Sequence, residues 1–296
     1  MSVETPATAE AGGALDASSP AAARRDRIRL LLRSPTFLVG FIVLLFWIFC
    51  ALFGAEIVPI DPYVDDLMSA LAPPSADHWF GTDALGRDLF SRVIVGSRDI
   101  LTIAPLATLL GVILGTAIGL TVGYFRGLVD DTVSRLVDAV LALPLIIVAL
   151  LALVALGTSS VTVVIVIGLV FAPIIARTVR TAVMLERQLD YVAAAKLRGE
   201  NAAYIMVVEI LPNVMPPILV EATVRLGYAI FTVATLSFLG FGIQPPSADW
   251  GLAISENYGL IGGGIWWIVL PNAAAIASLV VGVNLVADGV QEALAS

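Results

Sequence analysis

Residues that commonly catalyse reactions or bind metals are almost absent from this sequence. It has one cysteine, Cys50, and one histidine, His78, among 296 residues. A structural zinc site takes four ligands of those types, so we expect no metal site and no intrachain disulfide. The only lysine, Lys196, follows an alanine, whereas a phosphate-binding Walker A loop requires Gly-Lys-Ser/Thr. No nucleophile elbow or dinucleotide-binding glycine motif is found either, which indicates a protein that is not an enzyme.

The segment from Asp190 to Asn213 has the pattern of a short helix at a membrane surface. Asp190 is expected to cap that helix, and Gly199 to end it by adopting a positive φ. Leu211-Pro212 is then expected to restart the chain into a membrane span. Such a helix suits docking into a groove on another protein, and a well-capped connecting loop explains the spacing equally well. The residues singled out are Asp190, Tyr191, Ala193, Ala194, Ala195, Lys196, Arg198, Gly199, Leu211 and Pro212.

Two opposite charges, Glu221 and Arg225, lie four residues apart in an apolar stretch and therefore share one helix face. At about 1.5 Å of rise per residue, Arg225 lies roughly 13 Å beyond Pro216, near the middle of a membrane. A charge at that depth is costly and faces a cavity or a partner. We expect one of two roles. The commoner role is a neutralised pair that fixes helix packing or the contact with a second membrane subunit. The other role is a pathway-lining pair that contacts a zwitterionic solute.

The composition indicates the class of fold that holds these residues. Hydrophobic residues make up 59% of the chain and charged residues 14%, against roughly 45–50% and 25% in soluble domains. The mean hydropathy is +0.97. The sequence therefore predicts an all-α, polytopic membrane protein.

Stretches long enough to cross a bilayer, about 20 apolar residues each, predict six transmembrane helices. The run Ala139–Ala176 is too long for one crossing, and Gly157-Thr158-Ser159-Ser160 divides it into two helices. The other spans are expected near Pro35–Ala55, Ile100–Gly123, Pro216–Gly240 and Trp266–Val286. Trp266 and Trp267 sit where an outer aromatic belt is expected.

The basic residues predict the orientation. With the N-terminus inside, twelve of the sixteen lysines and arginines lie on the inner side, so both termini are expected in the cytoplasm. Residues 1–34 are expected to form a disordered tail with a basic flank, 35–290 the six-span domain, and 291–296 a cytoplasmic tail. Two loops are large enough for a function: an outer loop, 56–99, and an inner loop, 177–212.

The inner loop resembles the EAA loop of membrane subunits of binding-protein-dependent ABC importers. The resemblance rests on Ala194-Ala195-x-x-x-Gly199 followed by Ile210-Leu211-Pro212-Asn213. Further segments are similar to C-type permeases for dipeptides, oligopeptides and nickel. They are His78–Asp83, Gly86-Arg87-Asp88, Ser91-Arg92, Leu236–Gly242, Gln244-Pro245-Pro246, Trp250-Gly251, Asn284-Leu285 and Asp288-Gly289.

The resemblance implies the type I importer permease fold, also called MetI-like, and a coupling helix seated in a cleft of a separate ATPase. It implies a second homologous permease subunit, one or two cytoplasmic P-loop ATPase subunits, an extracytoplasmic solute-binding protein and a bilayer as partners, and no nucleic acid. ATP and Mg would be used by the ATPase subunits, with no cofactor on this chain. The expected location is the bacterial inner membrane, and the expected solute is a short peptide, with nickel or another small solute as the alternative.

One residue departs from the family pattern. The family usually has glutamate where this chain has Ala193, three residues after the expected cap, where a capping box would form. Its loss is expected to cost a few tenths to about 1 kcal/mol of helix order and to weaken a contact to the ATPase.

Three further features lead to predictions: a glycine stripe, an acidic loop and the single histidine. Gly111, Gly115, Gly119 and Gly123 predict close helix packing. The acidic outer loop could dock a solute-binding protein or simply be solvated; its acidic residues are Asp61, Asp65, Asp66, Asp77 and Asp83. His78, beside Trp79, is expected to be an interfacial side chain.

Two rival functions remain at this stage. An ion-coupled secondary transporter would use Glu221 or Asp288 as its titrating carboxylate. An assembly subunit without a pathway would bind partners but show no transport defect on substitution of Glu221 or Arg225.

Overall fold

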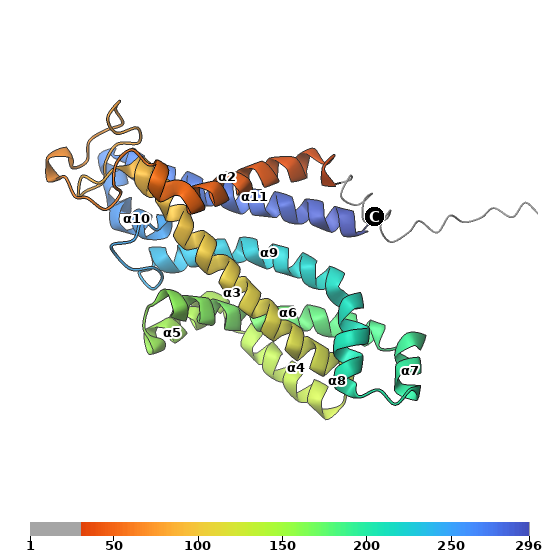
Figure 1. The fold of residues 1–296 in the computed structure, drawn as a ribbon. Helices are drawn as coiled ribbons and strands as arrows, with labels where there is room; N and C mark the ends of the chain where they lie inside the picture. Colours follow the sequence, from red (N-terminus) through yellow and green to blue (C-terminus); the bar gives the residue numbers. More distant parts are fainter. Residues whose placement is uncertain (1–30, 296) are drawn as a thin grey trace, which may run out of the picture.

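The computed structural model describes residues 31–295, and this part of the chain is all-helical (Figure 1). Residues 1–30 of the predicted tail and basic flank, 1–34, lie outside the described residues. The α-helices are α2 (Pro35–Ile57), α3 (Leu89–Phe125), α4 (Leu128–Leu141), α5 (Leu145–Leu156), α6 (Ser160–Glu186), α7 (Asp190–Leu197), α8 (Ala202–Tyr204), α9 (Leu211–Phe238), α10 (Trp250–Asn257) and α11 (Leu270–Ala295). Short 3₁₀ or π segments are η1 (Leu67–Ser69), η2 (Ile205–Ile210), η3 (Tyr258–Gly263) and η4 (Trp266–Ile268).

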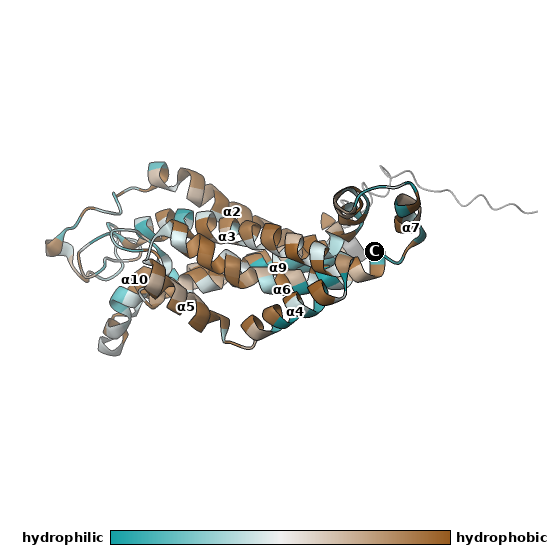
Figure 2. Cartoon of the chain, turned by 90° about the horizontal axis from the view of Figure 1, so that it is seen from below, coloured by the Kyte–Doolittle hydropathy of each residue, from teal (hydrophilic) through white to brown (hydrophobic). Residues whose placement is uncertain are grey.

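Five of these helical segments are long and apolar enough to cross a membrane, and the bent pair α4 and α5 makes a sixth crossing if counted as one span. The prediction of six spans is confirmed in that form. Apolar residues dominate the long helices, and hydrophilic residues gather toward the loops at one end and around α7 at the other (Figure 2).

The third crossing differs from the single helix predicted from Ala139 onward. α4 and α5 meet at 88°, because Pro144 has no N–H and restricts the residue before it. α5 is 12 residues long, about 18 Å, and covers only part of a hydrocarbon core of about 30 Å. The predicted division after α5 is confirmed, since Gly157 has φ +85° and Ser159 caps α6.

α3 packs most extensively against α6, and the predicted glycine stripe forms this contact. A Cβ on Gly115 would lie 2.7 Å from Cβ of Ile175, and one on Gly119 would lie 2.6 Å from Cβ of Val179. Real Cβ atoms do not approach so closely, so only glycine permits this separation. The prediction that the stripe serves helix packing is confirmed.

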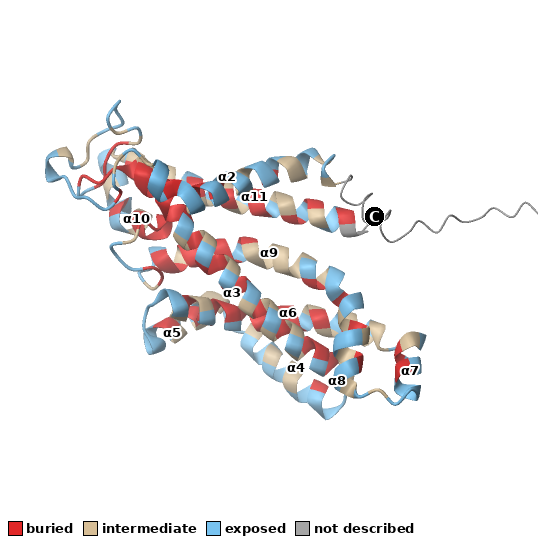
Figure 3. Ribbon diagram, viewed as in Figure 1, coloured by how far each residue is buried: buried red, intermediate tan, exposed pale blue. Residues whose placement is uncertain are grey.

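α2 and α11 form a second close pair. Gly40 of α2 faces the carbonyl of Gly282, and the indole N–H of Trp47 donates to the Ser278 hydroxyl at 2.9 Å. The rest of α2 is largely exposed, in contrast to the buried residues where α3 begins (Figure 3). The exposed face of α2 consists of large apolar side chains, as expected of a helix in contact with lipid or another membrane subunit.

The molecule has two distinct ends. Residues 58–88 and α10 lie at one end, here called the loop end, and α7 lies at the other, the α7 end (Figure 1). The start of α2 and the end of α11 both lie toward the α7 end. Because α3 begins at Leu89 rather than near Ile100, the loop at the loop end is shorter than predicted.

Candidate functional site

α7 is the short surface helix predicted between the fourth and fifth spans, and its start differs from expectation by one residue. Leu189 is the N-cap, with φ −78° and ψ 154°, and no side chain caps the helix. Asp190 is the first helical residue, so its predicted capping role is wrong. Its charge instead lies in the first turn, where the helix dipole favours an acid. Ala193 therefore falls outside the capping-box position.

The C-terminal end of α7 forms as predicted at Gly199. This residue has φ +82°, a conformation that glycine adopts without steric cost. Its N–H donates to the Lys196 carbonyl at 3.0 Å, and the N–H of Glu200 donates to the Ala195 carbonyl at 3.2 Å. These two bonds define a Schellman motif, which fixes where α7 stops.

α7 buries one face and presents the other. Val192 and Ala195 are fully buried, whereas Ala193 and Ala194 are exposed and Leu197 is 90% exposed. Residues three and four apart share a helix face. The exposed face is therefore two small side chains followed by one projecting leucine, a shape suited to insertion into a groove.

Polar contacts fix α7 against the ends of the long helices. The Tyr191 hydroxyl donates to Glu186 at 2.7 Å, and Arg198 donates to Glu209 at 2.6 Å. The Lys196 ammonium lies 5.5 Å from the centre of the Tyr124 ring at the end of α3, and the carbonyl of Tyr124 accepts from Arg187 at 2.5 Å. The helix is thus tied to α3, α6 and η2 while its outer face stays free.

Tyr191 remains protonated across the physiological range. Partial burial and its hydrogen bond to the Glu186 carboxylate raise the pKa of Tyr191 to about 12, since the phenolate would be poorly solvated and repelled by that acid. The hydroxyl is therefore a constant donor to Glu186.

The helix that leads into the fifth span begins earlier than predicted. Asn201 caps α8, accepting from the N–H of Tyr204 at 2.8 Å, and the helical chain runs unbroken from Ala202 to Phe238. Leu211-Pro212 is therefore not the restart. It lies inside the helix, just after η2, where the N–H of Leu211 donates to the Met206 carbonyl five residues back. This π turn changes the hydrogen-bond register just before Pro212, which has no N–H to donate.

The predicted pair Glu221 and Arg225 does form within α9. Arg225 Nε donates to Glu221 Oε1 at 2.5 Å, and the hydroxyl of Thr178 on α6 donates to the other Glu221 oxygen at 3.3 Å. The guanidinium carbon of Arg225 lies 5.1 Å from the centre of the Tyr228 ring, a cation–π distance. Both charged side chains are mostly buried.

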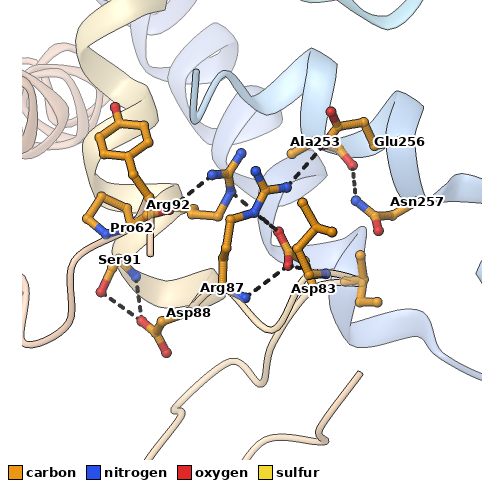
Figure 4. A network of polar contacts seen from close by, with 12 residues as sticks. Pro62, Asp83, Arg87, Asp88, Ser91, Arg92, Ala253, Glu256 and Asn257 are labelled. Carbon is orange, nitrogen blue, oxygen red and sulfur yellow. Dashed lines mark hydrogen bonds and ion pairs between the residues drawn. The ribbon is translucent and has the colours of Figure 1, made fainter. Parts of the chain in front are cut away.

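A second charged cluster, at the loop end, was not found by sequence reasoning (Figure 4). Arg87 Nε pairs with Asp83 at 2.7 Å and Arg87 Nη2 with Glu256 of α10 at 3.4 Å. Arg92, 1% exposed, donates to the carbonyls of Pro62 at 3.0 Å and Ser247 at 2.8 Å. These bonds join residues 58–88, α3 and the segment before α10 into one rigid unit.

Asp83 and His78 therefore behave differently from most of the acidic loop. Asp83 is buried, while Asp61, Asp65, Asp66 and Asp77 are exposed. His78 Nδ1 lies 3.0 Å from Asp88, which also caps α3 by accepting from the Ser91 N–H at 2.9 Å. Among the described residues no group of three potential metal ligands occurs.

The geometry defines a polytopic helical membrane protein with a short surface helix, α7, at one end. The family model of binding-protein-dependent transport system inner membrane components matches residues 108–296, and that of the N-terminal transmembrane domain of oligopeptide transport permease C matches residues 24–74. The chain belongs to the family of binding-protein-dependent transport system inner membrane components.

Curated relatives cover nearly the whole chain. The dipeptide transport system permease protein DppC of Alkalihalophilus pseudofirmus is 36% identical over 91% of this chain and 88% of its own length. The di/tripeptide transport system permease protein DppC of Pseudomonas aeruginosa is 37% identical, covering 86% of each chain. A probable D,D-dipeptide transport system permease protein of Escherichia coli is 34% identical over 90% of this chain and 89% of its own. The chain is thus a multi-pass inner-membrane permease, and the secondary-transporter alternative is not favoured.

Proposed function

We propose that this chain forms half of the translocation pathway for short peptides in an ABC importer and couples to a separate ATPase through α7. The peptide assignment is supported by the relatives, which are named as dipeptide and di/tripeptide permeases. The coupling assignment is carried by one observation: α7 is fixed at its flanks while Ala193, Ala194 and Leu197 project from its free face.

The fixing contacts give α7 a mechanical role. A force applied by a partner to the exposed face at Leu197 would be transmitted to α6 through the Tyr191–Glu186 hydrogen bond. It would be transmitted to η2, and from there to α9, through the Arg198–Glu209 ion pair. Closure of an ATPase around α7 would therefore move the spans that hold the Glu221–Arg225 pair. This link accounts for uptake driven by ATP in a chain with no Walker A motif.

The proposed assembly contains a second homologous permease subunit, one or two P-loop ATPase subunits and an extracytoplasmic solute-binding protein. ATP and Mg would be bound by the ATPase subunits. The α7 end would face the bacterial cytoplasm with both termini, since twelve of the sixteen lysines and arginines are predicted on the inner side. The loop end would face the binding protein.

The proposal is tested by replacing the projecting leucine of α7. In the importer reconstituted with its partners, Leu197→Asp should abolish peptide uptake while the chain still inserts and folds, because a charge on a docking face opposes burial. Leu128→Asp is the matched control: Leu128 is 86% exposed but lies on α4, and its variant should keep uptake.

A second variant tests the end of the same helix. Gly199→Trp meets no atom within 4 Å of its Cβ but must adopt a positive φ, so it should distort the Schellman turn and uncouple ATP hydrolysis from uptake. Wild-type uptake by a normally assembled Gly199→Trp or Leu197→Asp importer would contradict the coupling role.

A further inference from the structure

Arg225, which is paired with Glu221, lines a cavity of about 340 Å³ between α5, α6 and α9. Most of its wall is apolar and includes Leu145 and Ile146 of α5 and Phe171 of α6. Three side chains with polar groups, Arg225, Tyr228 and Thr232, come from one face of α9. An apolar cavity with a few convergent polar groups is the usual form of a small-molecule site, and this volume lies at the lower end of the range for such sites.

Arg225 has hydrogen-bonding capacity left over at this cavity. Its Nε is occupied by Glu221, but among the described residues neither terminal guanidinium nitrogen has a hydrogen-bond partner. The guanidinium carbon lies 5.1 Å from the centre of the Tyr228 ring, which holds the plane in place. A guanidinium in this state offers a fixed fork of N–H donors, which matches the two oxygens of a carboxylate.

The depth of the cavity in the membrane indicates which kind of anion could reach Arg225. Arg225 lies about 20 Å before the end of α9 at Phe238, near the middle of a hydrocarbon core of about 30 Å. Phospholipid headgroups lie at the surfaces of that core and do not reach it. Leu145 and Ile146 are also the first residues of α5, so the positive end of that helix dipole lies beside the same cavity and adds to the field that favours an anion.

We infer that Arg225 binds the free C-terminal carboxylate of the peptide as it passes the middle of the membrane, with Tyr228 packing against the peptide. The inference rests on the proposed function and adds a specificity to it. The permease itself would prefer peptides with a free C-terminus, through contacts separate from those of the binding protein.

The test compares uptake of one dipeptide with uptake of its C-terminal amide by the importer reconstituted with its partner subunits and binding protein. In the double variant Glu221→Gln/Arg225→Gln, which removes the pair without leaving an unpaired buried charge, uptake of the free dipeptide should fall roughly tenfold to a hundredfold. Uptake of the amide should stay near wild type. The same binding protein serves both importers, so its own selectivity cancels in the comparison.

The matched control is the double variant Asp130→Asn/Arg180→Gln. This pair is joined at 2.6 and 2.8 Å on α4 and α6 but does not line the cavity, so its loss should change uptake of both peptides by the same factor. An unchanged preference for the free dipeptide in the Glu221/Arg225 variant would overturn the inference. A smaller yield of assembled importer from that variant, with an unchanged preference in the importers that do assemble, would do the same and assign Arg225 to a subunit contact.

A second measurement leaves the charged pair intact. Thr232→Cys places a thiol in the cavity, and the native Cys50 is buried. The free dipeptide should protect this thiol from a water-soluble alkylating reagent at lower concentration than the amide does. Equal protection by both, or by neither, while the importer still takes up the dipeptide, would overturn the inference and leave the proposed function standing; absence of any uptake by the wild type would contradict the proposed function itself.

Discussion

The two ends of the molecule hold their charges in opposite ways. At the loop end, Asp83, Arg87 and Arg92 are buried, and the two arginines bond to partners far away in the sequence. At the α7 end, Arg198 is 52% exposed and bonds to Glu209, eleven residues away. The first arrangement locks several segments into one body, and the second fixes one small helix while leaving its outer face free.

The contrast indicates that the two ends contribute differently to stability and to transport. A buried charge whose partners are removed costs several kcal/mol, whereas an exposed pair contributes about 1 kcal/mol or less. The loop end should therefore resist deformation, whereas the α7 end leaves one surface free, as the proposed coupling to an ATPase requires. Substitutions at the two ends should separate stability from transport.

The largest effect is expected at Arg92. Arg92→Ala removes the donor to the Pro62 and Ser247 carbonyls and one of the two positive charges beside the buried Asp83 carboxylate. The free energy of unfolding should therefore fall by about 3–5 kcal/mol. The check is the melting midpoint of the purified permease in detergent. Arg98→Ala, on the exposed side of the same helix, should leave the midpoint unchanged; equal losses in the two variants would remove the basis for calling the loop end locked.

The second-largest loss of stability is expected at the contact between α3 and α6, which lies between the two ends. Gly119→Val puts a Cβ 2.6 Å from Val179 Cβ and 2.7 Å from the Ala176 carbonyl, so overpacking should destabilise the protein by about 1–3 kcal/mol. Gly262→Val, at a position with no atom within 4 Å, serves as the control in the same melting experiment. A Gly119 variant that melts like wild type would show that α3 and α6 separate easily.

A stabilising substitution is expected at the loop end. Burial raises the pKa of Asp249 to about 6, so the folded state favours the protonated acid. Stability from this group is full below the ordinary pKa of 3.8 and is lost as the pH rises through about 6. Asp249→Asn stays neutral and keeps an oxygen for the Leu252 N–H, so it should gain about 1–2 kcal/mol at pH 7.5.

The measurement for Asp249 is the melting midpoint at pH 4.5 and pH 7.5. The gap between the two values should narrow in the Asn variant and stay at its wild-type size in Asp77→Asn, which changes an exposed acid. A lower midpoint at pH 7.5 for Asp249→Asn would mean that the buried carboxylate is stabilised by its charge.

The smallest change in stability is expected at Arg198. Arg198→Ala breaks a pair that is half-exposed, so the free energy of unfolding should change by at most about 1 kcal/mol. Peptide uptake per ATP hydrolysed should fall, because α7 loses its side-chain link to η2. Arg177→Ala, which removes an exposed arginine of α6, is the control. A stability loss as large as that of Arg92→Ala would erase the contrast between the two ends.

Features that depend on one short stretch of chain were predictable from sequence. Gly199 ends α7 because a helix stop of this kind needs a positive φ, and the stripe from Gly111 to Gly123 packs because its period fits one helix face. The pairing of Glu221 with Arg225 follows from the same periodicity.

Features that depend on competing local signals were predicted less well. The apolar run continues through the bend between α4 and α5, where Pro144 is the sole sequence mark. Asp190 is a good capping residue, but the backbone of Leu189 already takes the capping conformation. Leu211-Pro212 has the pattern of a helix start, yet the preceding π turn accommodates the proline inside a helix.

The cluster at the loop end could not be predicted because its partners are remote. Arg87 meets Glu256, and Arg92 meets Ser247, more than 150 residues later in the chain. Nothing in the spacing of Asp83 and Arg87 distinguishes a buried pair from a solvated one. Only the packing of α10 against α3 brings these groups together.

The bend between α4 and α5 also bears on how the chain enters the membrane. α5 spans only about 18 Å, and α4 carries Asp130, Asp131, Arg135 and Asp138, each unfavourable in a bilayer. Neither half is a good insertion signal. The short turn at Gly157–Ser159 joins α5 to α6, which is apolar and long enough to cross. The third crossing should therefore be completed only after α6 has been synthesised, with the two entering as a hairpin.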